Sequence, residues 1–164
     1  MNLNRLARCA VLTALALALS MVEHAMPLTV LIPLPGLRLG LANLVTVFAL
    51  CRMSKAEAVL ILAARCLLGA IGSGAMTSLA FSLTGGLLAL AVMALLLYCP
   101  GLSLVGVCMA GAAAHNVGQV LAAMAVLGSG APLVYLPALL AASLLTGVVT
   151  GIASMLLIHR IPVK

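Results

Sequence analysis

Residues 75–98 read AMTSLAFSLTGGLLALAVMALLLY, a continuous run without a single Asp, Glu, Lys or Arg. At about 1.5 Å of rise per residue, a helix of this length crosses the roughly 30 Å hydrocarbon core of a bilayer. A run this long and this apolar is typical of a membrane span and not of a helix in a water-soluble domain. The stretch therefore predicts a transmembrane helix over 75–98.

The whole chain has the same character. Of its 164 residues, 66% are hydrophobic and 6% are charged, whereas about 25% of a typical soluble domain is charged. This composition excludes a soluble globular protein and a disordered one. The net charge of +6 is spread over separate polar breaks, and the chain has no Trp and only two Phe and two Tyr. We therefore expect no nucleic-acid partner, because base stacking needs aromatic side chains.

Apolar runs broken by Pro, Gly or basic residues predict five further helices, over 9–25, 39–51, 56–71, 102–127 and 133–158. The predicted fold is all-α, a bundle of about six transmembrane helices in a single integral membrane domain over 1–164. The run 9–25 also resembles a cleaved signal peptide, but the equally apolar sequence after it favours a retained span. The run 39–51 is short for a bilayer, and short, Pro/Gly-interrupted segments point to a binding site.

The basic residues predict the orientation. With the N-terminus inside, the cytoplasmic side collects Arg5, Arg8, Arg52, Lys55, Arg160 and Lys164. The outer side receives Arg38, which on its own could equally serve as an interfacial anchor. By the positive-inside rule both termini are cytoplasmic.

Small residues recur on the first predicted helix at a spacing of four. Ala10, Ala14 and Ala18 form a ridge on one helical face, which allows another helix to approach closely in lipid. Chance is the alternative, because the chain is rich in alanine.

Polar side chains inside apolar runs mark candidate binding residues. Arg65 is the one charge well inside a predicted span, and on the fifth helix positions 115 and 119 share a face. Facing one cavity, such groups would hold an anionic or heteroaromatic solute. The candidate substrate-binding residues are Arg38, Asn43, Arg65, His115, Asn116 and Gln119.

Each candidate also has a purely structural interpretation. An ion pair of Arg65 with Glu23 would fix helix register. Asn43 would cap a helix, and His115 and Asn116 would form hydrogen bonds between helices.

Catalytic motifs are missing from the sequence. The chain has no Asp and two Glu, which excludes an Asp-rich magnesium site, and its three His have no zinc-ligand spacing. No phosphate-binding loop of the GxxxxGK[ST] type occurs. We expect no catalytic residue, no metal and no cofactor, and no enzyme activity by this chain alone.

Three segments carry a family resemblance. Residues 37–43 (LRLGLAN, after the PLPG turn at 33–36), 82–86 (SLTGG) and 114–119 (AHNVGQ) resemble blocks of the Gx transporter family. Its members are often labelled heptaprenyl diphosphate synthase component I. Their layout is similar to that of the substrate-binding S components of energy-coupling factor transporters.

The resemblance implies a six-helix protein of the bacterial cytoplasmic (inner) membrane that binds a vitamin near its outer face. It also implies a transmembrane coupling protein and two ATPase subunits as partners, with Ala10, Ala14 and Ala18 as the docking ridge and 26–38 as a lid. The expected function is an S-component-like subunit for uptake of a small vitamin-like or anionic solute. Two alternatives are a membrane accessory subunit of a heptaprenyl or polyprenyl diphosphate synthase and a structural subunit of a membrane redox complex.

Overall fold

The computed structural model describes residues 3–25, 40–74 and 76–160 of the chain. This part contains helices and no strands, which confirms the predicted all-α class. The candidate lid 26–38, together with Arg38, lies outside the described residues. The elements in chain order are α1 (Leu3–Ala25), α3 (Leu41–Arg52), α4 (Lys55–Ser73), α5 (Met76–Leu96), α6 (Leu104–Leu127), the short 3-10 helix η1 (Ala131–Tyr135) and α7 (Leu136–Arg160).

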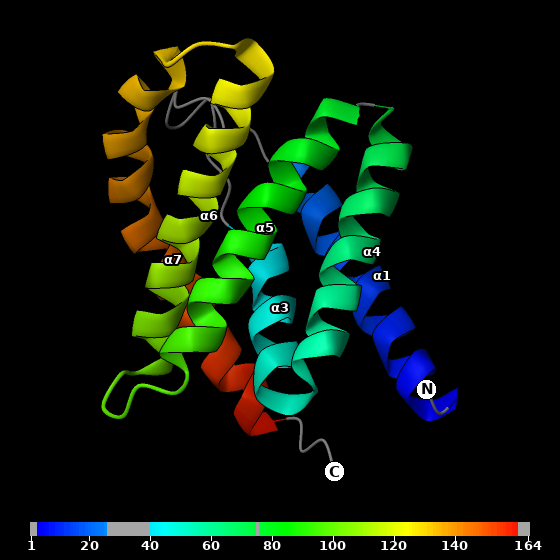
Figure 1. Ribbon diagram of the computed structural model, residues 1–164. Coiled ribbons are helices and arrows are strands. Elements are labelled where there is room, and N and C mark those ends of the chain that lie inside the picture. Colours follow the sequence, from blue (N-terminus) through cyan, green and yellow to red (C-terminus); the bar gives the residue numbers. More distant parts are fainter. Residues whose placement is uncertain (1–2, 26–39, 75, 161–164) are drawn as a thin grey trace.

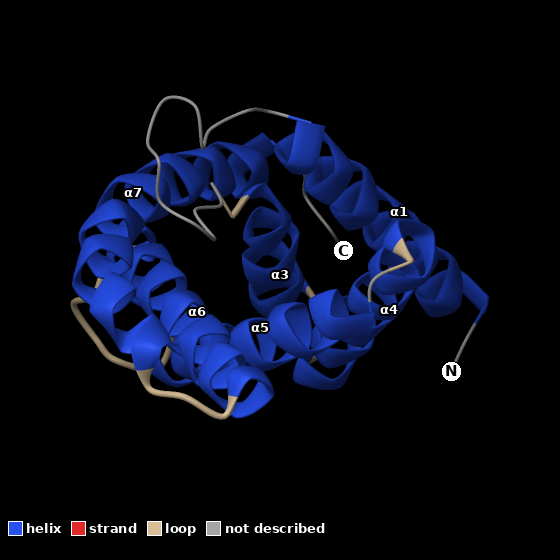
Figure 2. Cartoon of the chain, turned by 90° about the horizontal axis from the view of Figure 1, so that it is seen from above, coloured by secondary structure: helices blue, strands red, loops and turns tan. Residues whose placement is uncertain are grey.

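The helices are arranged around α3 (Figures 1 and 2). Seen from above, α7, α6, α5, α4 and α1 follow one another around the bundle, and α3 lies among them (Figure 2). Seven of the 12 residues of α3 are buried, as expected of a helix that is apolar on all sides. At about 1.5 Å per residue, α3 is only about 18 Å long. The short second helix predicted from the sequence is therefore the centre of the bundle.

Five helical segments of the described chain are long and apolar enough to cross a membrane, and α3 is the shorter apolar helix beside them. The protein is thus a multi-pass membrane protein. Its exposed surface carries large apolar side chains along these helices, such as Leu67, Leu121 and Leu145. Contact with lipid chains explains this exposed apolar surface, so no partner protein is needed to cover it.

Local signals fix the helix ends. Ser54 and Glu57 form a capping box at the start of α4, in which each side chain bonds the other residue's backbone N–H. Gly74 and Gly128 end α4 and α6 in the left-handed region, with φ of 66° and 61°, which glycine adopts without strain. At the N-terminal end of the chain, α1 begins at Leu3 and not at the predicted residue 9, because the helix includes the polar residues that precede the apolar run.

Figure 1 shows that α1 and α4 begin, and α3 and α7 end, at one end of the bundle. Arg5, Arg8, Arg52, Lys55 and Arg160 belong to these helix ends. Arg52 Nη2 donates to the carbonyl of Ile158 at 2.6 Å and so joins the ends of α3 and α7. Nearby, the Lys55 ammonium lies 4.5 Å from the ring centre of Tyr98. We call this the basic end; it is the arrangement that the positive-inside rule predicts for a cytoplasmic face.

Close packing of α5 on α6 holds the middle of the bundle. A Cβ on Gly118 would lie 2.7 Å from the Cα of Gly85 and 2.8 Å from the carbonyl oxygen of Thr84. Backbones this close exclude any side chain larger than hydrogen, which is how small residues allow helices to approach in membranes. The same contact brings His115 of α6 against α5, since a Cβ on Gly85 would lie 3.1 Å from its Cε1.

Candidate functional site

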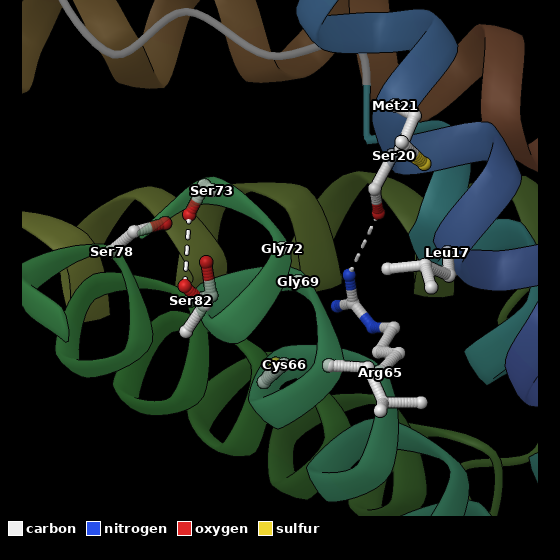
Figure 3. Close-up of a pocket in the computed structure, with 12 residues that line it drawn as sticks. Leu17, Ser20, Met21, Arg65, Cys66, Gly69, Gly72, Ser73, Ser78 and Ser82 are labelled. Carbon is white, nitrogen blue, oxygen red and sulfur yellow. Dashed lines mark hydrogen bonds between the residues drawn. The ribbon is translucent and has the colours of Figure 1, made fainter. Parts of the chain in front are cut away.

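A cavity of about 460 Å³ lies among α1, α4 and α5 (Figure 3). Its mouth includes Met21, Gly72 and Ser73, which are exposed and belong to the last turns of α1 and α4. Since α4 begins at the basic end, the mouth is at the opposite end of the bundle. The volume falls within the roughly 300–1,000 Å³ of small-molecule sites.

Arg65 supplies the charge in this cavity. Its side chain is 8% exposed and its Nη1 donates to Ser20 Oγ at 3.5 Å, across from α4 to α1 (Figure 3). Ser20 in turn donates to the carbonyl of Ala16 at 2.9 Å. The backbone of Arg65 precedes the end of α4 by about 12 Å of helix, so this side chain rises from the floor of the cavity and its guanidinium reaches Ser20 of α1 (Figure 3).

A second, smaller cavity of about 20 Å³ adjoins the first, with Ser20, Arg65 and Ser82 lining both. Glu23, Gly40, Ala42, Asn43 and His115 complete its lining. The volume has room for about one water molecule. Its polar walls come from α1, α3, α4, α5 and α6, so this small cavity is the point where five helices meet.

Glu23 connects two of these helices. Its Oε1 accepts a hydrogen bond of 2.6 Å from the backbone N–H of Gly40, which is the N-cap of α3 with φ of 73°. A carboxylate at this position satisfies a backbone donor and complements the positive end of the helix dipole.

Three of the candidate binding residues meet in the small cavity. Asn43, Arg65 and His115 are each buried and all line it. Asn43 is not the cap of α3, since Gly40 occupies that position. These three residues come from three different helices, and the fold is what brings them together.

The remaining candidates lie elsewhere. Asn116 Nδ2 donates to the carbonyl of Leu139 at 2.9 Å, a buried bond that links α6 to α7. Gln119 packs against α5, with its Cγ 3.0 Å from where a Cβ on Gly85 would be. Neither residue lines the two cavities. The structure thus gives Asn116 the interhelical role that the sequence left as the alternative.

Several cavity residues were not among the candidates. Ser20, Ser78 and Ser82 line the large cavity, but hydroxyls in membrane helices commonly bond their own backbone. Thr84 does so, donating to the carbonyl of Ala80 at 2.6 Å. The signal in the sequence was the spacing of four between Ser78 and Ser82, which places them on one helical face.

The alanine ridge faces outward. Ala10, Ala14 and Ala18 are exposed, whereas Cys9, Thr13 and Ala16 on the same helix are buried. Within the part of the chain that the structure describes, the ridge is therefore not used for packing. It presents three small side chains on the exposed side of α1, next to the exposed Val11 and Leu15.

A multi-pass helical membrane protein with an open, partly polar cavity between its helices is the class that this fold and this site define. Residues 12–157 match the family model described as heptaprenyl diphosphate synthase component I. The chain belongs to this family, and the resemblance read from its three sequence blocks is confirmed. No curated protein and no solved structure matches the chain.

Proposed function

We propose that the chain is the substrate-binding membrane subunit of an energy-coupling factor type uptake transporter, located in the bacterial cytoplasmic membrane. It would take up a small vitamin-like or anionic solute and would have no enzyme activity of its own. The single observation that carries the proposal is the large cavity with the buried Arg65 at its floor and its mouth opposite the basic end. A subunit that captures a solute from outside needs a site open at that end.

The exposed alanines Ala10, Ala14 and Ala18 support the proposal that a partner protein docks on α1. A smooth ridge lets a helix of another protein approach α1 closely, and close approach drives helix association in lipid. The proposed occupant is the transmembrane coupling protein, which would connect this subunit to two ATPase subunits. ATP-driven reorientation of the bundle would then expose the cavity to the cytoplasm.

A second candidate follows from the family's description: a membrane accessory subunit of a heptaprenyl or polyprenyl diphosphate synthase. The absence of Asp from the whole sequence argues against a catalytic role in that reaction, because its substrates are handled through magnesium bound by carboxylates. The cavity with the buried Arg65 favours solute binding, since an accessory subunit needs a partner surface and not a pocket of this size.

Purification of the tagged protein from its native host in mild detergent, followed by mass spectrometry, tests the proposal. A coupling protein and two ATPase subunits should co-purify. Recovery of a soluble, Asp-rich prenyl synthase subunit in their place would overturn the proposal and favour the second candidate. Recovery of large redox subunits would equally overturn it and identify a structural subunit of a redox complex.

A further inference from the structure

Building on the proposed solute-binding function, we propose the chemical class of the solute. The large cavity takes a water-soluble organic molecule with a single negative charge at one end, an apolar body, and a neutral hydrogen-bonding group at the other end. The charged group would lie at Arg65 and Ser20. Diphosphates, the ligands that the family's description suggests, would be excluded.

The charge of the site argues for one negative charge. Among the described residues that line the two cavities, Arg65 is the sole Lys or Arg, and Glu23 lies in the small cavity beside it. One guanidinium matches one carboxylate, with which it can form two parallel hydrogen bonds. The Glu23 charge is placed at the positive end of α3, where the carboxylate accepts the N–H of Gly40. A diphosphate brings several negative charges, of which the one guanidinium matches only one.

Diphosphates also need more cations than the described residues of this site offer. Proteins usually hold them with a magnesium ion bound through carboxylates, or with several basic side chains. No cluster of three or more His, Cys, Asp or Glu that could hold a metal occurs in the described parts of the chain. Excess negative charge at the floor of this cavity would therefore stay uncompensated, which is costly in a low dielectric.

The side chains that line the large cavity indicate the chemical character of the rest of the solute. Leu17 and Met21 lie on the side of Arg65, and Ser73, Ser78 and Ser82 lie on the opposite side (Figure 3). An apolar body can bury itself against the aliphatic side chains. The hydroxyls across the cavity can bond a neutral polar group but do not compensate a second charge.

The probe 6-hydroxy-2-naphthoate has this pattern, with a carboxylate and a hydroxyl at opposite ends of an apolar ring system. Its binding to the purified protein in phosphatidylcholine nanodiscs is measured by fluorescence anisotropy, with little background because the chain has no Trp. The neutral 6-hydroxy-2-naphthamide is the matched ligand. We expect saturable binding of the naphthoate and at least roughly tenfold weaker binding of the amide.

Two variants locate the site. Arg65→Gln should weaken naphthoate binding by roughly tenfold to a hundredfold and weaken amide binding much less, because only the naphthoate loses a charge-assisted hydrogen bond. Gly72→Leu should weaken binding of both, because Gly72 lines the cavity, and a Cβ added there meets no atom within 4 Å. Gly130→Leu, at another glycine with open space and outside the cavity, should bind like the parent.

Several results would overturn the inference. Equal affinity of the parent for naphthoate and amide would show that charge is not recognised, a comparison that needs no variant to fold. Competition by geranyl diphosphate at concentrations similar to the naphthoate's would contradict the exclusion of diphosphates. Loss of naphthoate binding in phosphatidylglycerol nanodiscs would mean that an anionic lipid headgroup, and not a free solute, fills the site.

Failure here and failure of the proposed function are distinguishable. If the coupling protein and ATPases co-purify but the naphthoate does not bind, the transporter assignment stands and the solute class is wrong. If the naphthoate binds through Arg65 but a prenyl synthase subunit co-purifies, the solute class stands and the transporter assignment is wrong.

Discussion

The Glu23 carboxylate of α1 accepts the N–H of Gly40 at 2.6 Å and thereby holds the start of α3 against the end of α1. This bond borders the small cavity on which Arg65, Asn43 and His115 also converge. It makes a buried carboxylate part of the structure that surrounds the proposed solute site.

Replacing this carboxylate should weaken the bundle. Glu23→Gln keeps an acceptor for Gly40 but removes the charge at the positive end of α3, which is worth about 0.5–2 kcal/mol when partly buried. We expect the midpoint of thermal unfolding in detergent to fall by several degrees. An unchanged midpoint would mean that the carboxylate charge does not stabilise the packing of α3 in the bundle.

The α5–α6 contact should not tolerate a methyl group. In Gly118→Ala the new Cβ would lie 2.7 Å from the Cα of Gly85, so the helices must separate, at a cost of about 1–3 kcal/mol. The matched control is Gly72→Ala, where the Cβ meets nothing within 4 Å and alanine is favoured in a helix by about 1 kcal/mol. Thermal unfolding should show a lower midpoint for the first variant and an equal or higher one for the second.

Asn116 should matter for stability and not for solute binding. Asn116→Ala removes the buried bond to the Leu139 carbonyl, and such bonds between membrane helices contribute about 0.6 kcal/mol on average. We expect a slightly lower unfolding midpoint with unchanged affinity for 6-hydroxy-2-naphthoate. A large loss of affinity would place Asn116 at the ligand, against its observed contact.

The outward face of α1 should be required for assembly alone. Ala14→Leu adds bulk to the exposed ridge, so co-purification of the coupling protein should be lost while naphthoate affinity is retained. Ala141→Leu is the control, because Ala141 is an exposed alanine on α7. If both variants assemble like the parent, the ridge is not an interface.

Much of the fold was readable from the sequence because lipid imposes a simple rule. Each membrane helix must be long and apolar, so the runs around 75–98 and 102–127 located α5 and α6 within a few residues. Helix ends were less accurate, since polar turns continue a helix beyond the apolar run, as Arg5 and Arg8 do in α1. The central position of α3 was not predicted, because its short length does not say which neighbours surround it.

The site was predicted in part for the same reason. Arg65 stood out because a charge inside an apolar helix is costly and needs a function. His115 and Asn116 are neighbours on α6, about 100° apart around the helix, so one borders the cavity and the other faces α7. Composition alone does not tell which of the two side chains borders the cavity, because both His115 and Asn116 are buried. The serines of the cavity were not among the candidates because hydroxyls in membrane helices often bond their own backbone.

The depth of Arg65 has an electrical consequence. From Arg65 the helix α4 continues for only about 15 Å to the basic end, while the cavity above it opens toward the other side. If water fills the cavity, most of the transmembrane voltage would fall across the protein between Arg65 and the basic end, which is the part of the bundle that surrounds α3. An anion that reached Arg65 from outside would have crossed little of the field, and the electrical work of inward transport, about 2.3 kcal/mol per charge at 100 mV, would fall on the step that carries it past α3.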